Sequence, residues 1–177
     1  SDGSSGSELW AHDTSNASTW QVADINSGSN GSNPGWTPGP LSMAKLVGDT
    51  IYFSANDGSS GHELWAHDTS TSSTWQAADI NSGIGSSQVG SYMAILVGDT
   101  LYFGAHDGSS GSELWAHDTS STSTWQVADI NSGIGSSNPG YGMEAILVGD
   151  TIYFDAHDGS SGSELWAMNI EHSITYD

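Results

Sequence analysis

The sequence predicts an all-β protein of short antiparallel strands with essentially no helix. One phrase of strand-forming residues recurs along the 177-residue chain: "GDTIYFSANDGSSGHELWAHDTS" from Gly48, "GDTLYFGAHDGSSGSELWAHDTS" from Gly98 and "GDTIYFDAHDGSSGSELWA" from Gly149. The runs within it are rich in β-branched and aromatic residues and are bounded by Gly, Asp, Asn and Ser. No segment has a helical period of useful length.

Each repeat offers four strands, which in the second unit are expected at Met43–Val47, Thr50–Ala55, Glu63–Asp68 and Thr74–Ile80. The two residues between the first and second strands suit a hairpin. Several runs lack strict polar alternation, which is typical of sheets covered on both faces. Four antiparallel strands in a unit of roughly 50 residues predict a blade of a β-propeller.

The Glu-Leu-Trp motif marks the repeat, and it begins at Glu8, Glu63, Glu113 and Glu164. These glutamates are 55, 50 and 51 residues apart, and a period near 50 predicts a single repeat domain with about three and a half blades. Its parts are a partial blade with the third and fourth strands and a long variable loop (1–42), two full blades (43–92 and 93–142), and a final blade with a divergent end (143–177). All length variation falls between "DINSG" and the next "LVGD", so one connection varies while the rest is a fixed framework.

The phrases "DGSSGxELWAHDTS", "WQVADINSG" and "VGDTIYF" resemble the ELWxxDGT-type repeat of secreted and surface proteins of bacteria and archaea. The resemblance covers essentially the whole chain. It departs from the family pattern in "ELWAHDTS", where Thr-Ser replaces Gly-Thr, and in the final "ELWAMNIEHSITYD". The resemblance implies an extracellular, propeller-like repeat domain. It supplies no enzymatic activity, so no functional residue is carried over from it.

The composition limits the possible partners. The chain has 21 acidic residues, one basic residue (Lys45), no cysteine and a formal charge of −20. Nucleic acid and anionic membrane surfaces are therefore excluded as partners, because both require Lys and Arg. No apolar run is long enough to span a membrane, and no signal peptide is present, as expected of a mature product, a fragment or an excised segment. Asn16 and Asn30 match the N-glycosylation acceptor pattern.

Two acid-bearing loops are expected at the same end of each blade, together with the variable connection. These are the "DGSSG" turn between the second and third strands and the "DINSG" exit from the fourth strand. Alternating oxygen ligands on a Gly-containing turn can bind Ca²⁺, although Asp and Asn also cap such turns through their own backbone. The candidate metal ligands are Asp24, Asn26, Asp57, Ser59, Glu63, Asp79, Asn81, Asp107, Ser109, Glu113, Asp129, Asn131, Asp158, Ser160 and Glu164.

Catalysis is not expected. Although the chain has seven His, neighbours such as His67 and Asp68 point to opposite faces of a strand and cannot form a dyad with each other. No Cys, G-x-S-x-G or H-E-x-x-H motif is present. Enzymes also usually draw their catalytic residues from unlike positions, whereas here the same residues recur in every repeat.

Two functions agree with this sequence. The first is a non-enzymatic extracellular structural or adhesive module whose copies assemble by completing one another's blades, as a ring or a filament, with Ca²⁺ as a possible bridge. The alternative is a lectin-like propeller that binds carbohydrate through the aromatic residues of the variable loop, Trp36, Tyr92 and Tyr141. Exposure of these rings favours sugar binding, and their burial favours the structural function. The Trp residues of the third and fourth strands are expected to pack between blades.

Overall fold

The computed structural model describes residues 3–37 and 43–170, and this part of the chain is all-β, as the sequence predicts. Its strands are β1 (Leu9–Asp13), β2 (Ser18–Ala23), β3 (Ala44–Val47), β4 (Thr50–Asn56), β5 (His62–Asp68), β6 (Ser73–Ala78), β7 (Ala94–Val97), β8 (Thr100–His106), β9 (Ser112–Asp118), β10 (Ser123–Ala128), β11 (Ile146–Val148), β12 (Thr151–His157) and β13 (Ser163–Asn169). The four strands expected in the second unit are confirmed, with ends that differ by one or two residues. Within the described ranges, the chain forms no helix of the length and apolarity that would cross a membrane.

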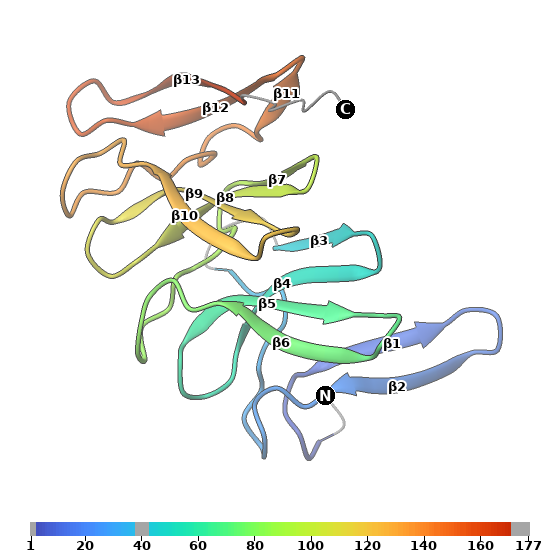
Figure 1. Ribbon diagram of the computed structural model, residues 1–177. Helices are drawn as coiled ribbons and strands as arrows, with labels where there is room; N and C mark the ends of the chain where they lie inside the picture. The colour runs from blue at the N-terminus through green and yellow to red at the C-terminus, as the bar shows by residue number, and fades with distance from the viewer. Residues whose placement is uncertain (1–2, 38–42, 171–177) are drawn as a thin grey trace.

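The strands form four antiparallel sheets in which neighbours in sequence are neighbours in space. Two sheets have four strands, β3-β4-β5-β6 and β7-β8-β9-β10, while β1-β2 and β11-β12-β13 have two and three. The sheets follow one another as an open array, with β1-β2 and β11-β12-β13 at opposite ends (Figure 1). The weak fourth strand considered for "HSITYD" lies outside the described residues.

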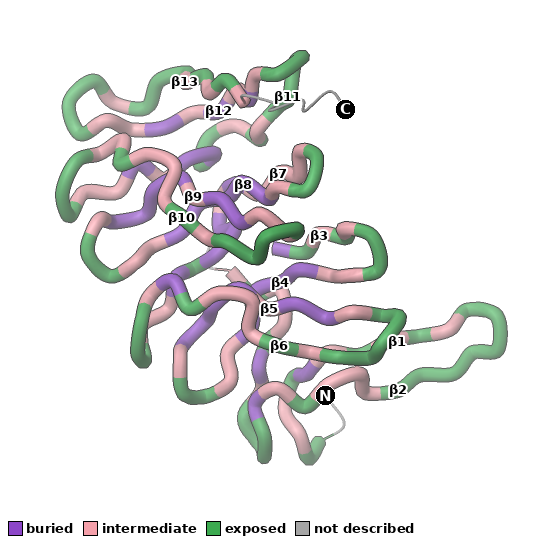
Figure 2. The backbone as a smooth tube through the Cα atoms, in the orientation of Figure 1, coloured by how far each residue is buried: buried purple, intermediate pink, exposed green. Residues whose placement is uncertain are grey.

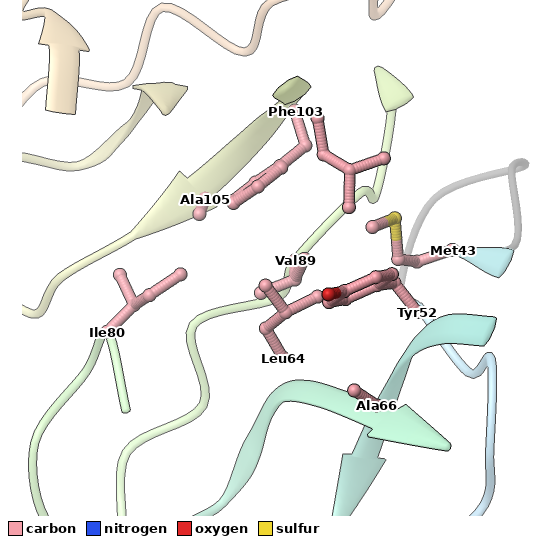
Figure 3. Close-up of a cluster of buried hydrophobic side chains, with 9 residues drawn as sticks. Met43, Tyr52, Leu64, Ala66, Ile80, Val89, Phe103 and Ala105 are labelled. Carbon is pink, nitrogen blue, oxygen red and sulfur yellow. The ribbon is translucent and has the colours of Figure 1, made fainter. Parts of the chain in front are cut away.

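The two inner sheets, β3-β4-β5-β6 and β7-β8-β9-β10, are covered on both faces by their neighbours (Figure 1). In the second blade, β3-β4-β5-β6, one face carries Tyr52, Leu64 and Ala66 and is termed the forward face. It packs against Phe103 and Ala105 of the third blade, β7-β8-β9-β10 (Figure 3). Val89, from the segment between these blades, lies in the same cluster. This two-sided burial explains why the strands lack strict polar alternation.

The same packing recurs at the next junction. There the forward face of the third blade, with Tyr102, Leu114 and Ala116, meets Ile152 and Phe154 of the last sheet. The forward face of the last sheet is different, because β13 is largely exposed along its length (Figure 2). The forward face of every blade is the one with the equivalent tyrosine, leucine and alanine positions.

The tryptophans of the strands divide into two groups. Those of the third strand pack between blades as expected in two cases, since Trp115 lies against the first core cluster and Trp166 against the second. Those of the fourth strand, Trp20, Trp75 and Trp125, are 47%, 39% and 41% exposed. Packing between blades therefore accounts for only part of the tryptophan pattern.

Candidate functional site

The second-to-third turn of each blade and the linker that leaves its fourth strand lie at one end, as the sequence predicts. In the second blade, the backbone N–H of Ser87 in the linker donates to the carbonyl of His62, next to the turn, at 2.9 Å. The turn and the linker approach each other closely, because a Cβ added to Gly61 in the turn would lie 2.2 Å from the carbonyl oxygen of Gly85 in the linker. The turns and linkers together form a surface that we term the loop face.

A buried glutamate holds each linker in place. Glu63 is fully buried, and its carboxylate accepts the backbone N–H groups of Ile80 at 2.7 Å and Ser87 at 2.9 Å. Burial raises the pKa of Glu63 to about 7, although these N–H donors act in the opposite direction. Burial likewise raises the pKa of the equivalent Glu113. The same clamp is formed by Glu113 with Ile130 and Ser137, and by Glu8 with Ile25 and Ser32.

The serine of this clamp also joins one blade to the next. Ser87 is fully buried, and its carbonyl accepts the N–H of His106 at the end of β8, at 2.8 Å. Ser32 and Ser137 make the same bond to Asn56 and His157. The sequence analysis missed these serines, although each lies 24 residues after its glutamate in all three cases. That constant separation was the available signal.

The aspartate of the DGSSG turn caps its own turn. Asp57 accepts the backbone N–H groups of Ser59 and Ser60, both at 2.8 Å, and also their hydroxyls. Burial alone would raise the pKa of Asp57, but these hydrogen bonds outweigh it and lower the pKa to about 2. Asp107 and Asp158 cap their turns in the same way, and the pKa of each is likewise lowered.

The asparagine of "DINSG" braces the linker and touches the next blade. Asn81 Nδ2 donates to the carbonyl of Ser86 at 3.2 Å. Its Oδ1 lies so near Gly108, in the next DGSSG turn, that a Cβ there would be 2.7 Å away. Asn26 and Asn131 occupy the same position against Gly58 and Gly159. These asparagines therefore contribute to the contact between blades.

The candidate metal ligands are engaged mainly in these structural bonds. Among the described residues, no group of three or more His, Asp or Glu side chains could hold a metal ion. Glu164, the counterpart of Glu63, is exposed, and so are Asp24, Asp79 and Asp129. Ca²⁺ binding stays a prediction, for which these exposed carboxylates are the accessible ligands.

Two of the histidines are partly or fully enclosed between blades. His67 and His117 bond through Nδ1 to the hydroxyls of Thr74 and Thr124 at 2.8 and 2.7 Å. The ring of His117 lies 5.4 Å from that of Tyr52, on the forward face of the preceding blade. Burial lowers the pKa of His117, against a smaller opposing effect of Asp118.

The aromatic residues of the variable connection lie on the loop face. Trp36 and Tyr141 hold the same turn position, since their backbone N–H groups donate to the backbone carbonyls of Asn33 and Asn138, respectively. Tyr92 lies one residue beyond the corresponding Ser91, and its ring meets that of Tyr141 edge to face at 4.9 Å. The ring of Trp36 lies against that of His62, with their centroids 4.7 Å apart and their planes tilted by 39°.

These rings are accessible to solvent, at 50% exposed for Trp36 and 66% for Tyr141. A hollow of about 270 Å³ adjoins Tyr141 and is lined also by Ser137, Asn138, His157 and Ser163. Of the three aromatics, the structure brings Tyr92 and Tyr141 together and leaves Trp36 at another junction. The sequence alone did not indicate Asn138, His157 or Ser163.

Comparison with known proteins supports the fold alone. No known family profile matches the chain, and no curated protein matches its sequence. Among solved structures, the chain is similar to TolB from Acinetobacter baumannii, with a TM-score of 0.51 and 17% sequence identity. The match covers 94% of this chain but only 36% of that one. The fold is β-propeller-like. The chain thus spans about a third of the length of that TolB chain.

Proposed function

We propose that the chain is a non-enzymatic structural or adhesive repeat module whose copies associate through the last sheet. The observation that carries this proposal is the exposure of Leu165 on β13. Its side chain is 66% exposed, whereas the equivalent Leu64 and Leu114 are 0% and 1% exposed. Inner blades bury this position under a neighbouring blade, so a blade of a second copy offers the matching surface.

The other end of the array supplies a surface of the right kind. Trp10 is 37% exposed on the face of β1-β2 that corresponds to the packed face of Trp115. The two end sheets also have unpaired edges among the described strands, because β1 pairs only with β2 and β13 only with β12. Unpaired edges favour strand addition from another chain, and a head-to-tail contact of unlike surfaces produces a ring or a filament.

Two features limit the strength of this association. Asp155 lies on the forward face of the last sheet, at the position of Ser54 and Gly104 in the inner blades. Its carboxylate accepts hydrogen bonds from Gly142 and Met143, so it is held in place there. The net charge of −20 also makes copies repel each other, and this repulsion weakens as salt rises. Association is therefore expected to strengthen with ionic strength.

The non-enzymatic part of the proposal rests on how the reactive groups are used. Glu63 and Asp57 are occupied by backbone N–H donors, and His67 bonds to a threonine hydroxyl. An extracellular location and membership of the ELWxxDGT-type repeat family are proposed from the resemblance of the repeat sequence. Bridging of copies by Ca²⁺ through the exposed aspartates of the loop face is part of the same proposal.

Sedimentation velocity over a range of concentrations in added salt tests this proposal. Leu165→Glu should abolish association, because it places a charge on the contact face. Ile134→Glu is the matched control, since Ile134 is 92% exposed in a linker and gains the same charge. Asp155→Ser, which restores the residue of the second blade, should strengthen association. A wild-type chain that stays monomeric throughout, or equal effects of the two glutamate variants, would contradict the proposal.

A further inference from the structure

The four sheets meet at three junctions, numbered in chain order from the one between β1-β2 and β3-β4-β5-β6. The hollow beside Tyr141 lies at the third junction and differs from the corresponding places at the other two. At the first junction His62 occupies the position of Ser163 and is covered by the ring of Trp36. At the second junction Ser91 replaces the aromatic residue, and Ser112 is buried. Only the third junction combines an exposed ring with a small, exposed serine at these two positions.

The hollow has one apolar wall of fixed orientation. Tyr141 is 66% exposed, and the ring of Tyr92 meets it edge to face at 4.9 Å. Such edge-to-face pairs are favourable, so Tyr92 helps to hold the ring of Tyr141 in place. A flat ring at the edge of a hollow offers a platform for the C–H face of a ligand of similar size.

The other walls carry neutral hydrogen-bonding groups of both kinds. His157 Nδ1 accepts the N–H of Gly159 at 2.8 Å, so in the neutral ring the Nε2 is a donor. Ser163 Oγ donates to Asp155 at 3.0 Å and keeps its lone pairs as acceptors. The amide of Asn138 bonds to no other described side chain or backbone group and offers both a donor and an acceptor.

Charge restricts the ligand further. The chain contains one basic residue, Lys45, and carries a formal charge of −20, so anionic ligands are repelled. No carboxylate lines the hollow directly, and that of Asp155 is already bonded to Gly142, Met143 and Ser163. A ligand with a fixed positive charge therefore lacks a partner of opposite charge in the lining.

We propose that this hollow binds a neutral sugar ring, with Tyr141 as the stacking platform and Asn138, His157 and Ser163 as hydrogen-bonding partners. A volume of about 270 Å³ suits a single ring rather than a long ligand. The hollow borders the face proposed for association, because His157 ends β12 and Ser163 begins β13, so its binding is measured in low salt, where that association is expected to be weakest.

Saturation-transfer NMR on the full chain tests this site with four neutral probes: the methyl glycosides of glucose, galactose and mannose, and N-acetylglucosamine. At least one should bind saturably. Tyr141→Ala should weaken that binding by about tenfold. Ser163→His should abolish it by placing at the third junction the residue found at the first. Both positions are exposed, so folding is checked by an unchanged thermal midpoint.

Trp36→Ala is the matched control, because it removes a ring from the same turn position at the first junction and should leave binding unchanged. Choline and glucuronate serve as charged probes and should not bind. Binding of none of the neutral probes, equal binding in Ser163→His, loss of binding in Trp36→Ala, or binding of choline alone would each overturn the proposal.

Discussion

The buried carboxylate of Glu63 gives a prediction in which two physical effects oppose each other. Burial favours the protonated acid, whereas the N–H donors of Ile80 and Ser87 favour the carboxylate. The pKa of Glu63 is raised from 4.5 to about 7, so burial is the stronger of the two effects. The folded state then binds the proton more tightly than the unfolded state, so the contribution of Glu63 to stability falls as pH rises from about 4.5 to about 7.

Glu63→Gln reports this effect because glutamine cannot ionise. The free energy of unfolding of the wild type exceeds that of the variant most at low pH, where both side chains are neutral. This gap should narrow by about 3 kcal/mol as pH rises through the window, since each tenfold change in proton affinity is worth about 1.4 kcal/mol. Comparing the two proteins at each pH removes the titration of the groups that they share.

Urea unfolding at a series of pH values measures the gap. Glu164→Gln is the matched control, because Glu164 is the exposed counterpart of Glu63 and the variant removes the same charge at the same repeat position. Glu113→Gln should behave like Glu63→Gln in direction, since burial raises the pKa of Glu113 too. A gap that widens with pH would show that the N–H donors dominate, and the reasoning would be refuted.

Three further predictions follow from the contacts between blades and from the loop face. Gly108→Ala should destabilise the fold more than Gly3→Ala, measured by thermal unfolding, because both have φ +87° but only a Cβ at Gly108 meets Asn81; equal costs would contradict the contact. His117→Phe should remove a loss of stability that the wild type shows as pH falls below about 6.5, because burial depresses the folded-state pKa and the unfolded chain then takes up the proton; an unchanged acid limb in urea unfolding would refute it. Ca²⁺ should raise the thermal midpoint above that in chelator at matched ionic strength, and an unchanged midpoint would exclude a bound cation.

The fold was accessible from the sequence because its signals are local and repeated. The strand runs and the two-residue turn at Gly48, where φ is 57°, specify the hairpins directly. The shared end of the turns and linkers followed from the alternating direction of the strands alone. The open arrangement of the four sheets did not follow from the sequence, because nothing local in a repeat fixes the rotation between blades.

The roles of the acidic residues were harder to predict for a physical reason. A motif such as D-G-S-S-G-x-E has the same appearance whether its oxygens face solvent or backbone donors. The burial of Glu63 depends on Ile80 and Ser87, which are 17 and 24 residues away. Likewise, the hollow beside Tyr141 depends on Ser163 being small where the first junction has His62. These are contacts between distant segments, which residue types and local spacing do not reveal.

The clamp also predicts where the chain tolerates insertions. From Glu63 to Ser87 the length is fixed, because the carboxylate holds both Ile80 and Ser87. A Gly-Ser insertion after Gly83 should therefore separate these donors and leave a buried N–H unpaired, at a cost of about 1–3 kcal/mol. The same insertion after Tyr92 lies where the first unit is naturally longer, and loop closure alone should cost less than about 1 kcal/mol. Equal losses of unfolding free energy in urea for the two insertions would show that the glutamate clamp does not set the length of the linker.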